Sequence, residues 1–443
     1  MNIKNLIENN KYLEARKEII KLNSVDIANF LEDDVNVDTM LILFRLLPKD
    51  MAADVFSYMS IDMQKYIIQS ITDKEIKSIV DELFLDDAVD LLEEMPANIV
   101  KGVLKNTSKG RRDLINQFLN YEEYSAGSIM TIEFVNLRKE MTIKDALEYI
   151  KKVGLDKQTI NTCYVIDKYR KLEGIISIRK LILNDENTLI KDIMKENYVY
   201  INTYDDQEYV ASQFKKYDLT SMPVVDKEHR LVGIITIDDI VDIIDQENTE
   251  DFQKMAAMEP SENEYLKTGV FKLAKHRIIW LLILMISATF TGAIIRRFEN
   301  TLQSVVILAS FIPMLMDTGG NAGSQSSTLV IRGIALGEIE LKDMLKVVWK
   351  EFRVSIIAGF TLAVVNFFRI YYIEKVQFLV AVTVCLSLFF TVVLAKMVGG
   401  MLPIIAKKLK LDPAIMASPL ITTIVDAVAL TVYFSLATFL LGI

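Results

Sequence analysis

The chain has 443 residues, enough for several domains, and 51% of them are hydrophobic, which predicts that part of the chain lies in a membrane. Residues 1–270 carry 50 acidic and 34 basic side chains, whereas residues 271–443 carry 9 and 16, so the first half is expected to repel nucleic acid and attract cations. Two separate cysteines and two histidines argue against a disulfide framework, a zinc site or a histidine-based triad, and we expect no enzymatic activity.

The N-terminal part, residues 1–125, is expected to be an acidic helical domain. Its start lacks the apolar core of a signal peptide, so it should stay in the cytoplasm. Apolar residues recur at helical spacing in segments of roughly ten residues. Short amphipathic helices cannot bury a face alone, so an irregular α-helical solenoid is predicted. One helix carries Asp86, Asp87 and Asp90 within a turn, with Asp86 and Asp90 on a shared face.

The sequence then repeats itself. Residues 163–182, "CYVIDKYRKLEGIISIRKLI", match residues 222–241, "MPVVDKEHRLVGIITIDDIV", with a constant offset of 59 that pairs Gly174 with Gly233. Each copy predicts strand, helix, strand, turn, strand and helix. This α/β pattern resembles a tandem pair of CBS (cystathionine-β-synthase) domains, expected over residues 126–187 and 188–247. The resemblance implies a regulatory module that often senses adenine nucleotides, so ATP is a candidate ligand.

An acidic run without any base extends from Asp238 to Asp251. Like charges at such spacing destabilise a helix unless counterions bind, and a hard divalent cation held by oxygen ligands and water is the natural partner. Ordinary solvated helix faces are the alternative interpretation. The run is expected to be helical and to continue into a connecting helix over residues 248–271, which leads to a membrane domain over residues 272–443.

Five apolar stretches predict a five-helix transmembrane domain. They cover residues 278–295, 302–331, 354–373, 376–401 and 413–441. A helix needs roughly 20 residues to cross a bilayer, so the chain is expected to be a multi-pass membrane protein with its two ends on opposite sides. The more basic loops fall on one side, which the positive-inside rule assigns to the cytoplasm. The protein is therefore expected in the cell membrane, with its N-terminal domains on the cytoplasmic side and its C-terminus on the outer side.

Two lone carboxylates lie in these stretches. Asp317 is the only charge within residues 301–331, and Asp426 is the only one from residue 413 onward. Proline and glycine break the helices beside both, which is tolerated where the backbone lines protein or a watery cavity, so a shared aqueous path is expected. Locally paired or protonated structural carboxyls are the alternative. An aspartic protease is disfavoured, because "DTGG" at Asp317 is the only triplet of its kind.

The order of these parts resembles the MgtE family of bacterial magnesium channels and transporters over essentially the whole chain. Its most specific marks are "YEEYSAGSIM", "DPAIMASPLITTIVDA" and, in the second stretch, Pro313, Gly320, Asn321, Gly323 and Gln325. The resemblance implies a homodimer with a pore on its two-fold axis, Mg²⁺ as transported ion and Asp426 as the pore carboxylate. Ser418 and Thr422 share its face, and Asp317 is pore-lining or structural.

By the same resemblance, Mg²⁺ also binds the cytoplasmic acids. These ligands fall on Asp86, Asp90, Asp206, Glu208, Asp218, Asp239, Asp242, Glu247, Glu250 and Asp251. Bound Mg²⁺ would bridge the acidic surfaces and close the pore, and its loss would push them apart.

Two other function classes stay open. One is a CBS-regulated transporter of another divalent cation such as Co²⁺ or Mn²⁺, and the other is a membrane-anchored sensor of a nucleotide or metal. An anchor needs neither buried acids nor broken helices. The sequence also lacks the glycine-rich loop that ATP-driven pumps use to hold phosphate, so conduction is favoured.

Overall fold

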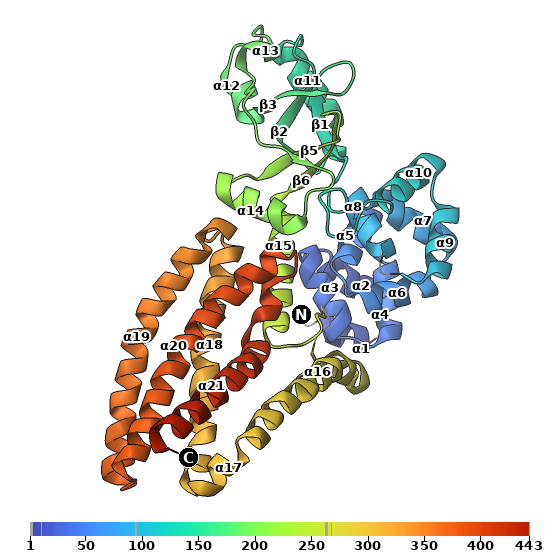
Figure 1. Cartoon of the computed structure of the whole chain (residues 1–443). Helices are drawn as coiled ribbons and strands as arrows, with labels where there is room; N and C mark the ends of the chain where they lie inside the picture. The colour runs from blue at the N-terminus through green and yellow to red at the C-terminus, as the bar shows by residue number, and fades with distance from the viewer. Residues whose placement is uncertain (1–2, 10, 94, 262–264, 267, 443) are drawn as a thin grey trace. The chain divides into compact units, whose positions relative to one another are not determined.

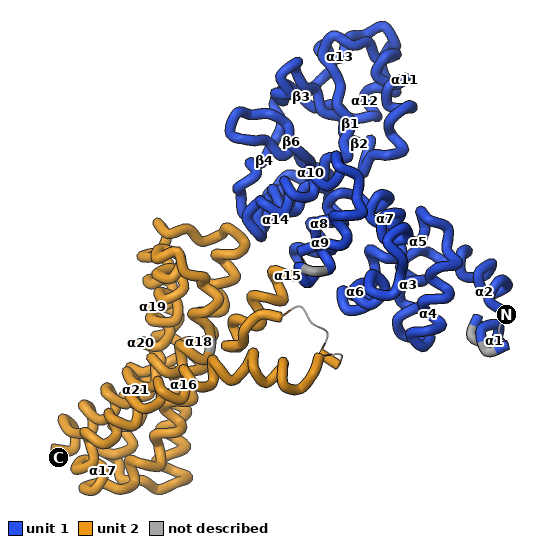
Figure 2. The backbone as a smooth tube through the Cα atoms, turned by 90° about the vertical axis from the view of Figure 1, so that its right-hand side faces the viewer, with its two compact units in different colours: residues 1–244 blue, residues 245–443 orange. Residues whose placement is uncertain are grey.

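The computed structural model describes residues 3–9, 11–93, 95–261, 265–266 and 268–442. The chain forms two compact units, Met1–Ile244 and Asp245–Ile443, which Figure 2 distinguishes by colour. Each unit is described by itself.

The described residues of the N-terminal part form ten short α-helices (Figure 1). They are α1 (Ile3–Glu8), α2 (Tyr12–Ile19), α3 (Ser24–Asp33), α4 (Val37–Arg45), α5 (Lys49–Ser57), α6 (Ile61–Ser70), α7 (Asp73–Glu82), α8 (Leu85–Glu93), α9 (Ala97–Asn106) and α10 (Lys109–Phe118). Local caps fix some starts: Thr72 and Glu75 form a capping box that satisfies free N–H groups of α7. Alternate helices stack, α3 on α5, α5 on α7 and α7 on α9. The predicted helical domain is confirmed.

Two three-stranded sheets follow, one from each copy of the repeat. Their strands are β1 (Phe134–Leu137), β2 (Thr159–Ile166) and β3 (Leu172–Ser177), then β4 (Ile201–Asn202), β5 (Ser221–Val225) and β6 (Leu231–Thr236). In each sheet the first strand pairs parallel, and the third antiparallel, with the middle strand. The helices of this region are α11 (Ile143–Val153), η1 (Gly154–Asp156), α12 (Ile178–Leu183), α13 (Ile190–Ile193), α14 (Gln207–Tyr217) and α15 (Ile237–Met255).

The repeat glycines sit where the backbone of one copy meets that of the other. A Cβ atom at Gly233 would lie 2.8 Å from the carbonyl oxygen of Thr131, and one at Gly174 would lie 3.2 Å from that of Lys195. Thr131 precedes the first copy yet pairs with β6 of the second, while Lys195 precedes the second copy yet pairs with β3 of the first. This exchange of segments ties the predicted pair of domains together.

The core of the first unit joins these parts. One hydrophobic cluster runs from the N-terminal helices into the second copy of the repeat, where it includes Val224, Ile235 and Ile240. A smaller cluster lies between the two sheets and includes Tyr164 and Val225. The start of α15 is therefore anchored in a core that the N-terminal helices share.

The second unit is helical. Its elements are α16 (Val270–Arg297), α17 (Glu299–Ser304), η2 (Val306–Phe311), α18 (Ile312–Ala335), η3 (Leu341–Asp343), α19 (Met344–Phe368), η4 (Arg369–Ile373), α20 (Phe378–Lys408), η5 (Pro413–Met416) and α21 (Ser418–Leu441). Within the described residues, four stretches are long and apolar enough to cross a membrane: Val270–Arg297, Leu341–Ile373, Phe378–Lys408 and Pro413–Leu441. The fifth long helix, α18, corresponds to the predicted second span and is rich in Gly, Ser and polar residues.

Among its described residues, the segment expected to connect the soluble and membrane parts is helical only at its two ends. Helix α15 covers the acidic run and stops at Met255, and α16 starts at Val270. Ala257 has a positive φ of 52°, which a helix does not accommodate, and Pro260 disfavours helix at the residue before it. A continuous helix over residues 248–271 is therefore not present in the described residues.

Candidate functional site

Helix α18 packs against both α20 and α21 (Figure 1), and glycines allow it to approach each of them closely. A Cβ atom at Gly320 would lie 2.8 Å from Cγ2 of Thr422, and one at Gly323 would lie 2.7 Å from Cγ2 of Ile421. On the other side, a Cβ at Gly399 of α20 would lie only 2.2 Å from the carbonyl oxygen of Gly323. Only glycine allows this approach, so the sequence fixes α18 closely against both neighbours.

A polar stripe runs along the exposed side of α18. Asp317, Asn321 and Gln325 follow each other at intervals of four residues, which places them on one helix face, and all three are exposed in the single chain. Pro313 stands in the first turn of α18, where its missing N–H costs no hydrogen bond. The helix was expected to break beside Asp317, but α18 runs unbroken from Ile312 to Ala335 through the glycines and is preceded by the 3₁₀ turn η2.

The adjoining face of α21 carries the second carboxylate. Asp426 is half-buried and close enough to Asp317 for their charges to interact. Thr422 and Thr423, one turn earlier, donate their hydroxyls to the carbonyl oxygen of Pro419, at 2.9 and 3.1 Å. The structure therefore brings the two predicted carboxylates together. Ser418 opens α21, and its side chain lies outside the described set.

One charged side chain of the membrane part was missed by the sequence analysis. Lys396 lies within α20 and is 7% exposed. Its Nζ lies 3.4 Å from Oε1 of Gln325 and 3.5 Å from Oγ of Ser326. A lone lysine inside an apolar stretch was a readable signal, since charges at membrane depth are usually functional.

The first unit holds an acidic cluster built from four parts of the chain. Its members, which interact electrostatically, are Asp54 of α5, Asp86 and Asp87 of α8, Glu133 before β1, and Asp238 and Asp239 at the start of α15. Sequence reasoning selected Asp86 and Asp239 as ligands but not the other four. It had no means of seeing that α8 and α15 meet.

Burial and mutual repulsion raise the pKa values of the cluster. Burial, then the charge of Asp239, raises the pKa of Asp86 well above its usual range, and Oδ2 of Asp86 is buried without a hydrogen-bond partner. Burial also raises the pKa of Asp87 to about 6, helped by the charges of Asp54, Asp238 and Glu133. Burial raises the pKa of Asp239 to about 6 against a hydrogen bond from Thr236. Such carboxylates gain more than solvated ones from a bound cation.

The remaining predicted ligands of the first unit are spread out. Asp90, one turn beyond Asp86, is exposed. Asp206 caps the start of α14 and accepts a hydrogen bond from the backbone N–H of Glu208, whereas Asp218 stands at the far end of that helix in a left-handed conformation. Asp242 is exposed on α15. Among the described residues, no three Asp, Glu, His or Cys side chains converge closely enough to hold a metal ion.

The last ligands lie in the second unit beside a lysine. Lys254 forms ion pairs with Glu250 and, at 2.6 Å, with Asp412, which precedes α21. Burial and then the charge of Asp412 raise the pKa of Asp251, against the opposing charge of Lys254. Glu247 lies one turn before Glu250 and Asp251 on α15. This group is therefore partly neutralised, unlike the cluster of the first unit.

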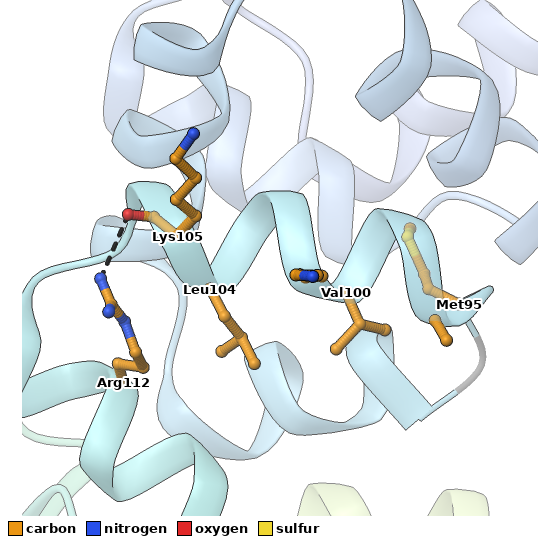
Figure 3. Close-up of a pocket in the computed structure, with 7 residues that line it drawn as sticks. Met95, Val100, Leu104, Lys105 and Arg112 are labelled. Atoms are coloured by element: carbon orange, nitrogen blue, oxygen red, sulfur yellow. Dashed lines mark hydrogen bonds between the residues drawn. The ribbon is translucent and has the colours of Figure 1, made fainter.

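The hollow drawn in Figure 3 has a different character. It measures about 550 Å³ and lies along α9, lined by apolar residues and by Lys101, Lys105 and Arg112. The guanidinium of Arg112 donates to the carbonyl oxygen of Lys105 at 3.1 Å. The basic lining does not suit a cation.

Comparison with known proteins decides the family. A model of divalent cation transporters matches residues 312–436, a model of the MgtE intracellular N domain matches residues 22–124, and CBS domain models match residues 126–186 and 190–246. The magnesium transporter MgtE of Thermus thermophilus is 37% identical over 93% of this chain and 92% of its own. The chain belongs to the MgtE family. The MgtE of Bacillus subtilis is 32% identical over 98% of this chain and 99% of its own.

Solved structures agree with this assignment. The soluble part of a magnesium transporter has a TM-score of 0.52 and 32% identity, covering 55% of this chain and 96% of its own. The cytosolic domain of the Mg²⁺ channel MgtE in complex with ATP also gives 0.52 and 32%, covering 54% of this chain and 98% of its own. Within this MgtE-family chain, the divalent cation transporter match starts with α18 and includes both Asp317 and Asp426. The family membership and the polar stripe thus point to the same helices.

Proposed function

We propose that this MgtE-family protein is a magnesium-selective channel or transporter of the cell membrane, gated by intracellular Mg²⁺. The observation that carries the proposal is the polar stripe of α18, with Asp317 and Asp426 close enough for their charges to interact among otherwise apolar helices. A charged side chain within a bilayer is costly, and such residues usually mark an ion pathway. That relatives over nearly the whole chain are named magnesium transporters supports Mg²⁺ as the substrate and argues for a transporter rather than an enzyme.

The stripe suits a hydrated ion. Mg²⁺ prefers six oxygen ligands and gives up its waters reluctantly, so carboxylate, amide and hydroxyl oxygens hold it best through its water shell. Asp317, Asn321 and Gln325 offer such oxygens in one row on α18, and Asp426 and Thr422 offer further ones on α21. Selectivity would then rest on the size and charge of the hydrated ion.

A homodimer completes the path. In a single chain, Asp317, Asn321 and Gln325 are exposed and would face lipid tails, where polar groups lack partners. A second copy related by a two-fold axis would cover this face and present a second Asp426. The two carboxylates would then share the ion.

The soluble acids would sense internal Mg²⁺, with the N-terminal domains in the cytoplasm and the C-terminus outside. The carboxylates of Asp86, Asp87 and Asp239 repel one another and Oδ2 of Asp86 lacks a partner, so a divalent ion held through its water shell would relieve this repulsion. We assign Asp90, Asp206, Glu208, Asp218 and Asp242 to the same role on exposed surfaces. Glu247, Glu250 and Asp251 of the second unit join them. Binding would favour the closed state and close the pore at high internal Mg²⁺.

The CBS pair would bind an adenine nucleotide. The cytosolic domain of the Mg²⁺ channel MgtE was solved in complex with ATP, and the resembling part of this chain includes the paired sheets with their exchanged segments. We infer a regulatory role for the nucleotide, since the transport path lies in other helices.

Flux measurements test the proposal. We expect liposomes that contain the purified wild-type protein to take up Mg²⁺. Uptake by the Asp426→Asn variant should fall to the level of empty liposomes. The control Glu338→Gln, which removes an acidic charge in the loop after α18, should show wild-type uptake. Competition by Co²⁺ and Mn²⁺ in the same assay would separate a magnesium-selective path from a general divalent one. Equal flux through wild type and Asp426→Asn would refute the path, and no flux at all would favour a membrane-anchored sensor.

A further inference from the structure

A buried lysine stands at one end of the polar stripe. Lys396 precedes Lys407, the first base of the last turn of α20, by eleven residues, which at 1.5 Å per residue places it roughly 16 Å along the helix from that end. It is the only charged residue of α20 before Lys407. A cation so deep in an apolar helix needs partners.

Its partners come from α18 and α19. The Nζ atom of Lys396 lies 3.4 Å from Oε1 of Gln325 and 3.5 Å from Oγ of Ser326, which is fully buried. The Ser326 hydroxyl in turn donates to Oε2 of Glu351 at 2.5 Å. The ammonium of Lys396 and the carboxylate of Glu351 therefore lie within about 6 Å of each other, on either side of the Ser326 hydroxyl.

The backbone of α20 near Lys396 packs closely against the backbone of α18 at two glycines. Gly399, three residues after Lys396, meets the carbonyl oxygen of Gly323, and Ala395 presents its own carbonyl oxygen to Gly323 at 3.3 Å from an added Cβ. This packing holds the backbone of α20 against α18 beside Lys396. From that position the buried ammonium reaches Gln325.

Gln325 is the last member of the polar stripe in chain order, so Lys396 places a positive charge at that end of the proposed path. We propose that Lys396 is a positioning residue for ion release: it donates to the oxygen of Gln325 and weakens cation binding there, so that Mg²⁺ leaves the path readily. Conduction requires sites strong enough to fill and weak enough to empty. This inference rests on the proposed function. Ser326 and, through it, Glu351 supply polar partners beside the buried ammonium.

The test compares transport kinetics per folded protein in liposomes for wild type, Lys396→Met, Lys396→Arg and Lys407→Met. Lys407 is an exposed lysine of the same helix and serves as the control. We expect Lys396→Met to lower both the half-saturating Mg²⁺ concentration and the maximal flux by about three- to tenfold. This is the effect expected from removing one screened charge near a divalent ion. Lys396→Arg keeps the charge and should retain wild-type kinetics, as should Lys407→Met.

A purely structural role would give a different result. If Lys396 only neutralises Glu351, the double variant Lys396→Met with Glu351→Gln removes both charges and restores wild-type kinetics, which overturns the inference. The same double variant keeps the test valid if Lys396→Met alone fails to fold: a lowered half-saturating concentration supports the role in release. If the wild-type protein conducts and a folded Lys396→Met variant has the same transport kinetics, this inference is refuted and the proposed function stands. Wild-type protein without flux refutes the proposed function and this inference with it.

Discussion

Asp87 offers a direct measure of how strained the acidic cluster is without a cation. Burial and the charges of Asp54, Asp238 and Glu133 raise its pKa from 3.8 to about 6. Between these values the folded chain binds more protons than the unfolded chain, so its stability falls as the pH rises. A shift of roughly two units corresponds to about 3 kcal/mol lost by pH 7, and to about 0.5 kcal/mol at pH 4.

Asp87→Asn removes this charge and should stabilise the metal-free soluble part. At pH 7 with a chelator, we expect a gain of about 3 kcal/mol, or roughly 6–12 °C in melting temperature for a unit of this size. At pH 4 the gain should nearly vanish, because the native carboxyl is then protonated in the wild type too. Melting of residues 1–255, followed by circular dichroism at both pH values, measures the difference.

The control is Asp81→Asn, an exposed acid on the neighbouring helix α7, which should leave the melting temperature unchanged. Adding Mg²⁺ should reduce the advantage of Asp87→Asn, since the ion compensates the same charge in the wild type. An equal gain at pH 4 and pH 7 would contradict the electrostatic argument. So would a variant no more stable than the wild type at pH 7.

Two further predictions follow from the same contacts. The affinity of the soluble part for Mg²⁺ should fall about tenfold between pH 7.5 and pH 5.5, because Asp87 and Asp239 protonate near pH 6. Calorimetric titration at both pH values measures this affinity. An affinity that is the same at both values would contradict the prediction. Gly399→Ala should destabilise the full-length protein in detergent by about 1–3 kcal/mol, because the added methyl group overpacks against α18. The control Gly292→Ala on α16, which has open space around it, should leave the stability unchanged. Equal melting temperatures for the two variants would disprove the close contact.

The repeat was readable from the sequence because its signal is local. The offset that pairs Gly174 with Gly233 also pairs their partners, Val165 and Val224, across the two sheets. The short turn between the second and third strands fixes the register within each copy. The exchange of the preceding segments between copies was not readable, because it depends on which surfaces meet after folding.

The site was predicted in part for the same reason. Lone acids in apolar stretches revealed Asp317 and Asp426, since the cost of a charge in a bilayer depends on composition alone. The spacing rule that placed Asp86 and Asp90 on one face could not say that α8 buries the first and exposes the second. Nor could it reveal that the charge of Asp239, at the start of α15 and about 150 residues further along the chain, acts on Asp86.

The two acidic sites differ in a way that bears on their roles. Carboxylates that are buried and crowded, as Asp86, Asp87 and Asp239 are, are destabilised without an ion and so respond strongly to its arrival. The stripe of α18 is exposed in the chain and lies beside a fixed cation at Lys396, which lowers its hold on a passing ion. A sensor needs a large difference in binding between two states, whereas a path needs sites that bind strongly enough to fill and weakly enough to empty. The chain thus places mutually repelling carboxylates at the proposed Mg²⁺ sensor and the positive charge of Lys396 beside the proposed ion path.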